Sequence, residues 1–235
     1  MDIFDDQHQF LNMNSDYSKQ LLSTFRLHRD PKNAEYMGRY MKDKFPYYGI
    51  KSPLRKEISK PFLARPALPP ISEVPSVINL LWSHPEREMQ YFSLDLLSKY
   101  ARVAPKDWID LYEELILTKS WWDSVDGLAS NQVGGHFQKF PDLIAPYTDK
   151  WMASGNIWLQ RTCLLFQLKY RGSTDFVLLT TFIKPLASSK EFFIKKAIGW
   201  SLRQFGKFSP DKVKNFVAEQ PMSNLSRKEA LRLIA

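Results

Sequence analysis

Apolar residues recur at spacings of three and four along almost the whole chain, and runs of alternating polarity are absent. This period is typical of amphipathic α-helices, because one helical turn takes 3.6 residues. Proline and glycine divide the pattern into helical segments joined by short turns. The sequence therefore predicts an all-α protein. Residues 60–75 are an exception, because their five prolines predict an extended connector.

Several segments carry residues that are typical of helix starts. Asp30–Pro31 and Ser52–Pro53 each place a capping side chain before a proline at the first helical position. Ser83, Ser120 and Ser189 are each followed by an acidic residue two or three positions later, as in a capping box or an acidic first turn. We expect helices to begin at these points.

The second half of the chain repeats with a period of 35 residues. Residues 154–161 align with residues 189–196, and one step back from Arg161 reaches Asp126. A helix-pair period of this length is typical of an α-solenoid, in which each unit buries its apolar face against its neighbours. Equivalent positions stack along such an array. We therefore expect Asp126, Arg161 and Lys196 to lie in one row on a concave surface.

One tryptophan lies off the apolar face of the helix predicted over residues 190–205. The buried-type stripe of that helix consists of Ile194, Ala197, Ile198, Ser201, Leu202 and Phe205. Trp200 lies about 130° from the centre of this stripe, beside Lys196 and Arg203. An indole between two cations is unusual in a core. Two interpretations of Trp200 stay open from the sequence. The indole is exposed for a functional role, or, more simply, it packs against an adjacent helix.

The helix predicted after Ser120 shows a similar division. One face is formed by Trp121, Val125, Leu128 and Gln132, whereas Trp122 and Asp126 lie together on another face, four residues apart. Asp126 lies past the first turn, so capping does not explain it. A functional role for Asp126 has two simpler alternatives. Its carboxylate lies on the surface, or it forms an ion pair with Arg161 between repeats, which would contribute little to stability if it were exposed.

Charge favours a polyanionic partner. The chain of 235 residues has a formal net charge of +8. Asp2, Asp5 and Asp6 fall within residues 1–15, which contain no Lys or Arg, so we expect an acidic N-terminal tail before a single domain over residues 16–235. A basic surplus in the remainder favours nucleic acid over a membrane surface.

Other classes of protein fit the sequence poorly. No apolar stretch approaches the roughly 20 residues of a membrane-spanning helix, and the acidic start resembles no signal peptide, so we expect a cytoplasmic protein. The four histidines lack the spacing of metal ligands, and the nine glycines form no nucleotide-binding fingerprint. Cys163 lies at core spacing, which predicts a packed thiol. We therefore predict no cofactor and no metal.

Exposed indoles, cations and one acid suggest a particular chemistry. Cations bind phosphates, and aromatic faces contact sugars or bases. A carboxylate is useful on a surface that binds polyanions when positive charge develops during the reaction, as it does on a sugar whose glycosidic bond breaks. A carboxylate about 4 Å from such a cation gains about 4 kcal/mol at an effective dielectric constant near 20. That gain corresponds to about a thousandfold in rate.

The chain resembles the bacterial DNA alkylation repair glycosylases built from HEAT-like repeats, the AlkD family. The resemblance covers about residues 20–235. It rests on AEYMGRYMK at residues 34–42, GIKSP at 49–53, TKSWWDSVD at 118–126, NIWLQR at 156–161, SSKEFFI at 188–194 and KAIGW at 196–200.

This resemblance implies a fold and an activity. The fold would be an α-solenoid of HEAT-like repeats with a concave basic face. The activity would be that of a monofunctional glycosylase that releases N3-methyladenine and N7-methylguanine types of cationic purine from duplex DNA without base flipping. The partner would be double-stranded DNA with alkylated bases, bound by a monomer in the bacterial cytoplasm.

The resemblance also assigns roles to individual residues. Asp126 would stabilise the oxocarbenium ion and orient water, and Trp122 and Trp200 would hold the deoxyribose. Tyr40 would complete the aromatic cleft, and Arg161 and Arg203 would bind phosphates. We add Lys196 to the DNA-binding set because of its place in the row.

A second hypothesis is a non-catalytic HEAT-like scaffold or DNA-binding protein, because period, basicity and exposed aromatic residues all allow it. The presence of Asp126 argues for catalysis. The sequence leaves open whether a lysine supplies lyase activity.

Overall fold

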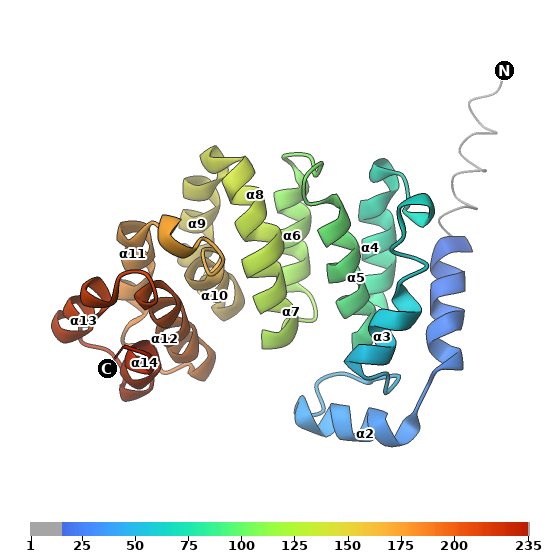
Figure 1. Cartoon of the computed structure of the whole chain (residues 1–235), viewed down its shortest axis with the longest axis horizontal. Coiled ribbons are helices and arrows are strands. Elements are labelled where there is room, and N and C mark those ends of the chain that lie inside the picture. The colour runs from blue at the N-terminus through green and yellow to red at the C-terminus, as the bar shows by residue number, and fades with distance from the viewer. Residues whose placement is uncertain (1–15, 235) are drawn as a thin grey trace. The chain divides into compact units, whose positions relative to one another are not determined.

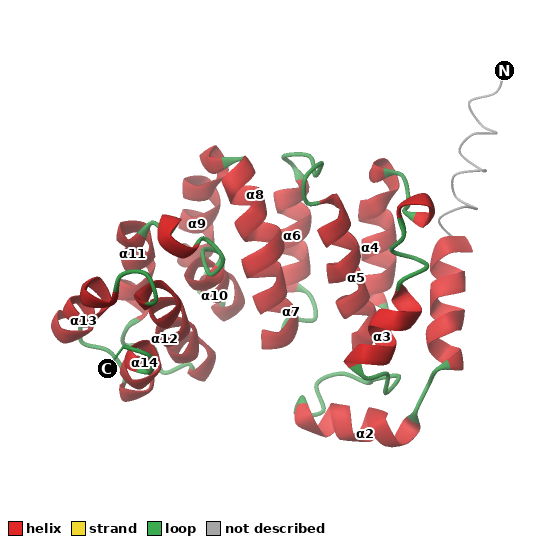
Figure 2. Cartoon of the chain, viewed as in Figure 1, coloured by secondary structure: helices red, strands yellow, loops and turns green. Residues whose placement is uncertain are grey.

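A computed structural model describes residues 16–234 (Figure 1). The expected acidic tail, residues 1–15, lies outside the described residues. The described chain forms helices and no strand (Figure 2), so the all-α fold class is confirmed. The HEAT-like solenoid with a concave basic face stays a prediction. None of the described helices is both long and apolar enough to cross a membrane.

The chain groups into two compact units, Met1–Ala104 and Pro105–Ala235. The single domain expected over residues 16–235 stays a prediction. The first unit contains a helix that ends at residue 27, followed by α2 (Pro31–Tyr40), α3 (Ser52–Ser59), α4 (Val74–Ser83) and α5 (Arg87–Tyr100). Between α3 and α4 the chain forms only the short 3-10 turns η1 (Arg65–Ala67) and η2 (Ile71–Glu73), so the predicted connector is confirmed over residues 60–73, whereas Val74 and Pro75 already belong to α4.

The turn after α2 is anchored by a buried carboxylate. Glu88 on α5 accepts hydrogen bonds from the backbone N–H groups of Tyr48, Gly49 and Ile50, at 2.9–3.1 Å. Gly49 has a φ of +88°, and a Cβ there would lie 2.0 Å from the carbonyl oxygen of Asp30. Only glycine fits this close approach. The GIKSP motif therefore has a structural explanation in the first unit.

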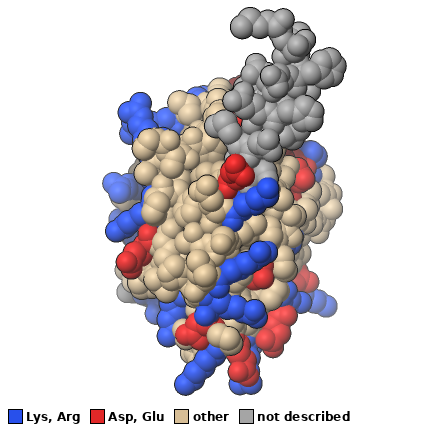
Figure 3. All heavy atoms as spheres, turned by 90° about the vertical axis from the view of Figure 1, so that its right-hand side faces the viewer, with Lys and Arg blue, Asp and Glu red and all other residues tan. Residues whose placement is uncertain are grey.

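Charges on the first unit are mixed on the face that Figure 3 presents. Basic and acidic side chains are interspersed there around a largely uncharged middle. The basic surplus of the sequence does not form a single patch on this face.

The second unit contains the remaining helices. These are α6 (Trp108–Leu117), α7 (Trp122–Gly127), the π-helical segment η3 (Leu128–Val133), α8 (Gly134–Lys139), η4 (Pro141–Leu143), α9 (Ile144–Ala153), α10 (Ile157–Leu165), η5 (Arg171–Ser173), α11 (Phe176–Leu186), α12 (Phe192–Gly206), α13 (Pro210–Glu219) and α14 (Asn224–Leu231).

Two serines that the sequence predicts as helix caps do not cap a helix, because their hydroxyls bond back to the preceding helix. Ser83 Oγ donates to the carbonyl oxygen of Leu80 at 2.7 Å, and Ser120 Oγ donates to that of Ile116 at 2.6 Å. A hydroxyl that bonds backward in this way is directed toward the preceding helix rather than toward the first N–H groups of the next one. Consequently α5 and α7 begin further along the chain, and neither has a side-chain cap.

The other predicted starts fall on or near the observed ones. Asp30 caps α2 by accepting from the N–H of Asn33 at 2.9 Å, as predicted. At α3 the N-cap position is Lys51, one residue before the predicted Ser52. Ser189 accepts from the backbone N–H of Glu191, but α12 begins only at Phe192 and has no side-chain cap. Prolines and acidic caps therefore locate helices here more reliably than serines do.

The core of the second unit follows the predicted stripes. All six apolar-face positions of α12 are buried, from Ile194 to Phe205. Cys163 is fully buried, and its Sγ lies 3.9 Å from the carbonyl oxygen of Thr148. Burial raises the pKa of the Cys163 thiol. A packed thiol is therefore confirmed.

Gly199 allows α14 to lie directly against α12. A Cβ at Gly199 would lie 2.4 Å from Glu229 Cβ and 2.9 Å from the carbonyl oxygen of Ser226. Ser226 Oγ also donates to the carbonyl oxygen of Lys195 at 3.0 Å, which fixes α14 on the same face. The missing side chain of Gly199 therefore sets the position of the C-terminal helix.

We expect Gly199→Ala to destabilise the protein by about 1–3 kcal/mol, because the added methyl group overlaps backbone that cannot move alone. Thermal denaturation followed by circular dichroism measures this loss. Gly135→Ala is the matched control, since a Cβ at Gly135 on α8 meets nothing within 4 Å. Alanine there should stabilise the helix by up to about 1 kcal/mol. Equal effects of the two substitutions would contradict the close approach of α14.

Candidate functional site

An open cleft in the second unit brings together most of the residues that the sequence singles out. Its volume is about 350 Å³. The side chains that line it come from α7, α10, α12 and α14: Trp122, Asp126, Arg161, Phe192, Phe193, Lys196, Trp200, Arg203 and Glu229. The predicted row of Asp126, Arg161 and Lys196 therefore shares one cleft.

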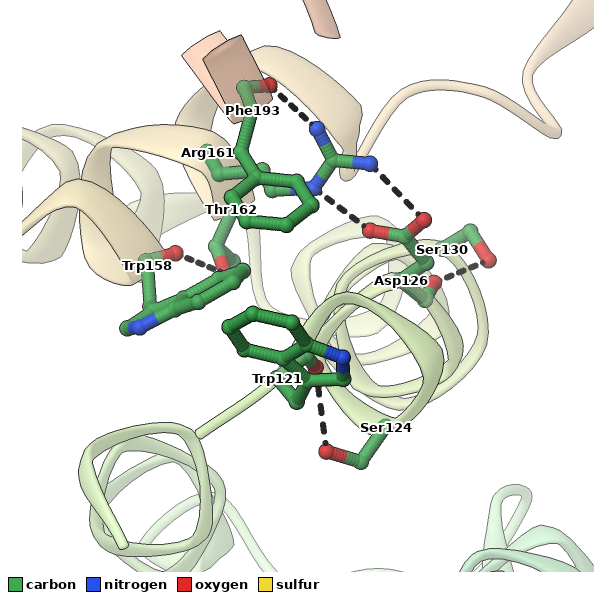
Figure 4. A network of polar contacts seen from close by, with 8 residues as sticks. All are labelled: Trp121, Ser124, Asp126, Ser130, Trp158, Arg161, Thr162 and Phe193. Carbon is green, nitrogen blue, oxygen red and sulfur yellow. Dashed lines mark hydrogen bonds and ion pairs between the residues drawn. The ribbon is translucent and has the colours of Figure 1, made fainter. Parts of the chain in front are cut away.

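Asp126 and Arg161 form a bidentate ion pair (Figure 4). Arg161 Nε lies 2.7 Å from Asp126 Oδ1, and Arg161 Nη2 lies 2.8 Å from Oδ2. Arg161 also donates through Nη1 to the carbonyl oxygen of Phe193 on α12. The exposed fraction is 4% for the Arg161 side chain and 16% for that of Asp126. The ion pair considered in the sequence analysis is thus present, but it is largely buried.

The pKa of Asp126 is raised above its usual value. Burial is the main cause, and repulsion by Asp123 adds to it, whereas the hydrogen bonds and charge of Arg161 act in the opposite direction. Arg161 therefore both orients the carboxylate and favours its ionised form. This is a role that the sequence analysis did not give Arg161, whose contact with a DNA phosphate stays a prediction.

The helix that carries Asp126 widens directly after it. Residues Leu128–Val133 form a π-helical segment between α7 and α8. Ser130 Oγ donates to the carbonyl oxygen of Asp126 at 2.7 Å (Figure 4), and Asn131 Nδ2 donates to that of Gly127 at 3.0 Å. π-helical turns inside α-helices are frequent at functional sites. The apolar spacing predicted an ordinary helix here and gave no sign of this segment.

Two indoles line the cleft with the carboxylate. Trp122 precedes Asp126 by one helical turn, and Trp200 comes from α12; both are partly exposed. Trp200 lies on the cleft side of α12, away from the buried stripe, as its angle predicted. The distribution of polar and apolar positions on α12 therefore located this side chain.

Two phenylalanines of the cleft were missed. Phe192 is exposed, and Phe193 packs against Trp121 and Trp158 with ring centroids 5.0 and 5.1 Å apart. Adjacent residues on a helix point about 100° apart, so two neighbouring phenylalanines cannot both lie on a narrow core stripe. That signal was present in the sequence.

A second carboxylate, that of Glu229, also lines the cleft. Glu229 on α14 accepts from Lys196 Nζ at 2.9 Å and from Arg203 Nη1. The hydrogen bond and charge of Lys196, together with those of Arg203, lower the pKa of Glu229. No spacing in the sequence connects Glu229 with α12, so this contact could be found only from the fold.

Tyr40 belongs to α2. It is exposed at the C-terminal end of α2, in the first unit. Its expected place in the aromatic cleft stays a prediction.

Comparisons with known proteins agree on one family. The family model described as DNA alkylation repair enzyme matches residues 21–234. A solved structure described as a predicted DNA alkylation repair enzyme from Enterococcus faecalis is 30% identical, with a TM-score of 0.82; the match covers 88% of this chain and 97% of that one. No curated protein matches. The chain therefore belongs to the family of DNA alkylation repair enzymes.

Proposed function

We propose that this protein is a monofunctional DNA glycosylase that hydrolyses the N-glycosidic bond of cationic alkylated purines in duplex DNA. The substrates would be of the N3-methyladenine and N7-methylguanine type. One observation carries the proposal: a largely buried carboxylate, Asp126, lines an open cleft together with two partly exposed indoles.

The reaction follows from the charge of the lesion. When the C1′–N bond breaks, its electron pair moves to the purine nitrogen and neutralises the positive charge of the base. The sugar becomes an oxocarbenium ion, which the Asp126 carboxylate stabilises. Water then adds to C1′ and loses a proton to solvent. A cationic base is already a good leaving group, so this scheme needs no general acid.

The remaining cleft residues would bind the nucleotide. Trp122 and Trp200 would contact the deoxyribose with their faces, and Lys196 and Arg203 would bind the adjacent phosphates. Because this arrangement holds the sugar and backbone, the base would not need a pocket of its own or flipping out of the duplex. Arg161 would keep Asp126 ionised and pointed into the cleft.

The direct experiment is to incubate the purified protein with methylated duplex DNA and to separate released bases by chromatography. We expect N3-methyladenine and N7-methylguanine in the soluble fraction, and no strand cleavage before alkaline treatment. Tight binding of the duplex without base release would favour the second hypothesis, a non-catalytic DNA-binding protein. Cleavage without alkali would indicate a lyase.

Trp200→Ala is expected to slow excision by about 10-fold to 100-fold, because contact with one aromatic face contributes roughly 1–3 kcal/mol to nucleic-acid binding sites. Trp200 is only partly buried, so its loss should change the melting temperature little. Trp200→Phe keeps an aromatic face and should retain most activity. A large fall in melting temperature with normal excision would instead make Trp200 a packing residue.

A further inference from the structure

The C-terminal helix α14 contributes a charged group to the cleft. Its Glu229 carboxylate bonds both Lys196 and Arg203, and only 17% of the Glu229 side chain is exposed. Lys196 and Arg203 are seven residues apart on α12, which corresponds to about 10 Å along the helix axis. A single carboxylate therefore holds the ends of two cations that start two turns apart.

Trp200 lies between these two cations. It follows Lys196 by four residues and precedes Arg203 by three, so all three share one face of α12. Because Glu229 bonds both cationic ends, it restrains these two side chains on the face of α12 that carries Trp200. Lysine and arginine have many rotamers, and ordering them in advance removes an entropy loss from the binding step.

The position of α14 itself is fixed by packing. The close approach at Gly199 and the hydrogen bond from Ser226 to Lys195 place Glu229 within reach of Lys196 and Arg203. The low pKa of Glu229 keeps it ionised at neutral pH. The Glu229 carboxylate repels the phosphates of DNA. A role in the reaction would offset this loss of DNA affinity.

We infer that Glu229 is a positioning residue for the proposed glycosylase reaction: it holds Lys196 and Arg203 in the geometry that places the lesion's phosphates and sugar against Asp126 and Trp200. The inference rests on the proposed function. It implies that Glu229 weakens overall DNA affinity while it increases the rate of the chemical step.

The test compares wild type, Glu229→Gln and Glu229→Asp by single-turnover excision and by affinity for undamaged duplex. Glutamine keeps the size but removes the charge, so duplex should bind with equal or higher affinity. Excision at saturating protein should fall by about 10-fold to 100-fold, because small misplacements of positioning groups have effects of that size. Glu229→Asp keeps the charge with a shorter reach and should lie in between. Glu219→Gln, at an exposed position on α13 outside the cleft, is the matched control.

A readout on the free protein separates this inference from the proposed function. Nitrogen-15 relaxation of the Arg203 Nε–H group should show an ordered side chain in wild type and a mobile one in Glu229→Gln. If Arg203 stays equally ordered, the inference is wrong whatever the activity. If the Arg203 side chain loses order in Glu229→Gln but wild type releases no base, the proposed function is wrong. In that case only the conclusion that Glu229 orders the cations remains.

Two further outcomes would overturn the inference. Tighter binding with unchanged or faster excision would mean that Glu229 only competes with DNA for the cations. A slower reaction in Glu229→Gln that persists unchanged on a Lys196→Met/Arg203→Met background would mean that Glu229 does not act through them. We expect the effect of Glu229→Gln to disappear on that background.

Discussion

Replacing Asp126 with asparagine is expected to lower the rate of alkylpurine release by about 100-fold to 1,000-fold, from the loss of one charge near the developing cation. The upper figure corresponds to a carboxylate about 4 Å from an oxocarbenium ion at an effective dielectric constant near 20. The neighbouring Arg161 charge offsets part of this attraction, which accounts for the lower figure. Single-turnover release from methylated duplex measures the loss.

This substitution also affects stability, which complicates its interpretation. Asparagine presents an amide N–H group to Arg161, which already donates to both carboxylate oxygens. Arg161 is 4% exposed and would be left as a buried charge without its counter-ion. Breaking a buried ion pair on one side typically destabilises a protein by about 3–5 kcal/mol. A fall in activity could therefore reflect unfolding.

The double variant Asp126→Asn/Arg161→Met separates the two effects. Methionine removes the unpaired charge and fills much of the same space, so the melting temperature should recover toward that of wild type. Excision should stay as low as in Asp126→Asn. If release recovers together with stability, Asp126 is structural and the glycosylase mechanism is wrong. Duplex affinity should be measured for each variant at one salt concentration, because phosphate contacts depend strongly on salt.

The sequence predicted which residues line the cleft more completely than it predicted how those residues contact one another. Helical angles placed Trp200 opposite the buried stripe of α12, and the 35-residue period placed Asp126 level with Arg161. Both inferences depend on regular geometry, which a sequence encodes directly. The burial of the pair was not predictable, because it depends on the approach of Phe193 on α12, whose carbonyl oxygen accepts from Arg161.

The contact of Glu229 with α12 could not be predicted from the sequence. It lies on a short helix outside the repeat, and its approach to α12 depends on the missing side chain of Gly199. A glycine within a helix has several explanations in a sequence, of which close packing is only one. The π-helical turn after Asp126 was also not predictable, because residues Leu128–Val133 keep the apolar spacing of an ordinary helix while the backbone widens.

Arg161→Met is expected to move the acid limb of the excision rate to higher pH by about 1–3 units, the usual effect of an arginine beside a carboxylate. The reaction requires ionised Asp126, and Arg161 is the group that counteracts burial and the repulsion from Asp123. Without Arg161 the pKa of Asp126 rises further. Activity should then fall off at a higher pH than in wild type and should recover as the pH is raised further. A pH–rate profile of single-turnover release measures the shift.

Stability should follow the same titration with a definite sign. Because the folded-state pKa of Asp126 is above its unfolded value, ionisation of this group opposes folding. Its contribution to stability is therefore largest below the unfolded pKa, near 4, and is lost as the pH rises through the folded pKa. Arg161→Met should extend that loss to higher pH, so the melting temperature of the variant should fall further below wild type at pH 8 than at pH 5.

The two roles considered for Arg161 predict different profiles. If Arg161 acts through Asp126, the rate and the stability both change with pH, and Asp126→Asn/Arg161→Met removes both dependences. If Arg161 acts only by binding a phosphate, duplex affinity falls by the same factor at every pH and the acid limb stays in place. The Asp126–Arg161 distances favour the first result, because two of the three N–H donors that point at acceptors in the protein are used on the carboxylate.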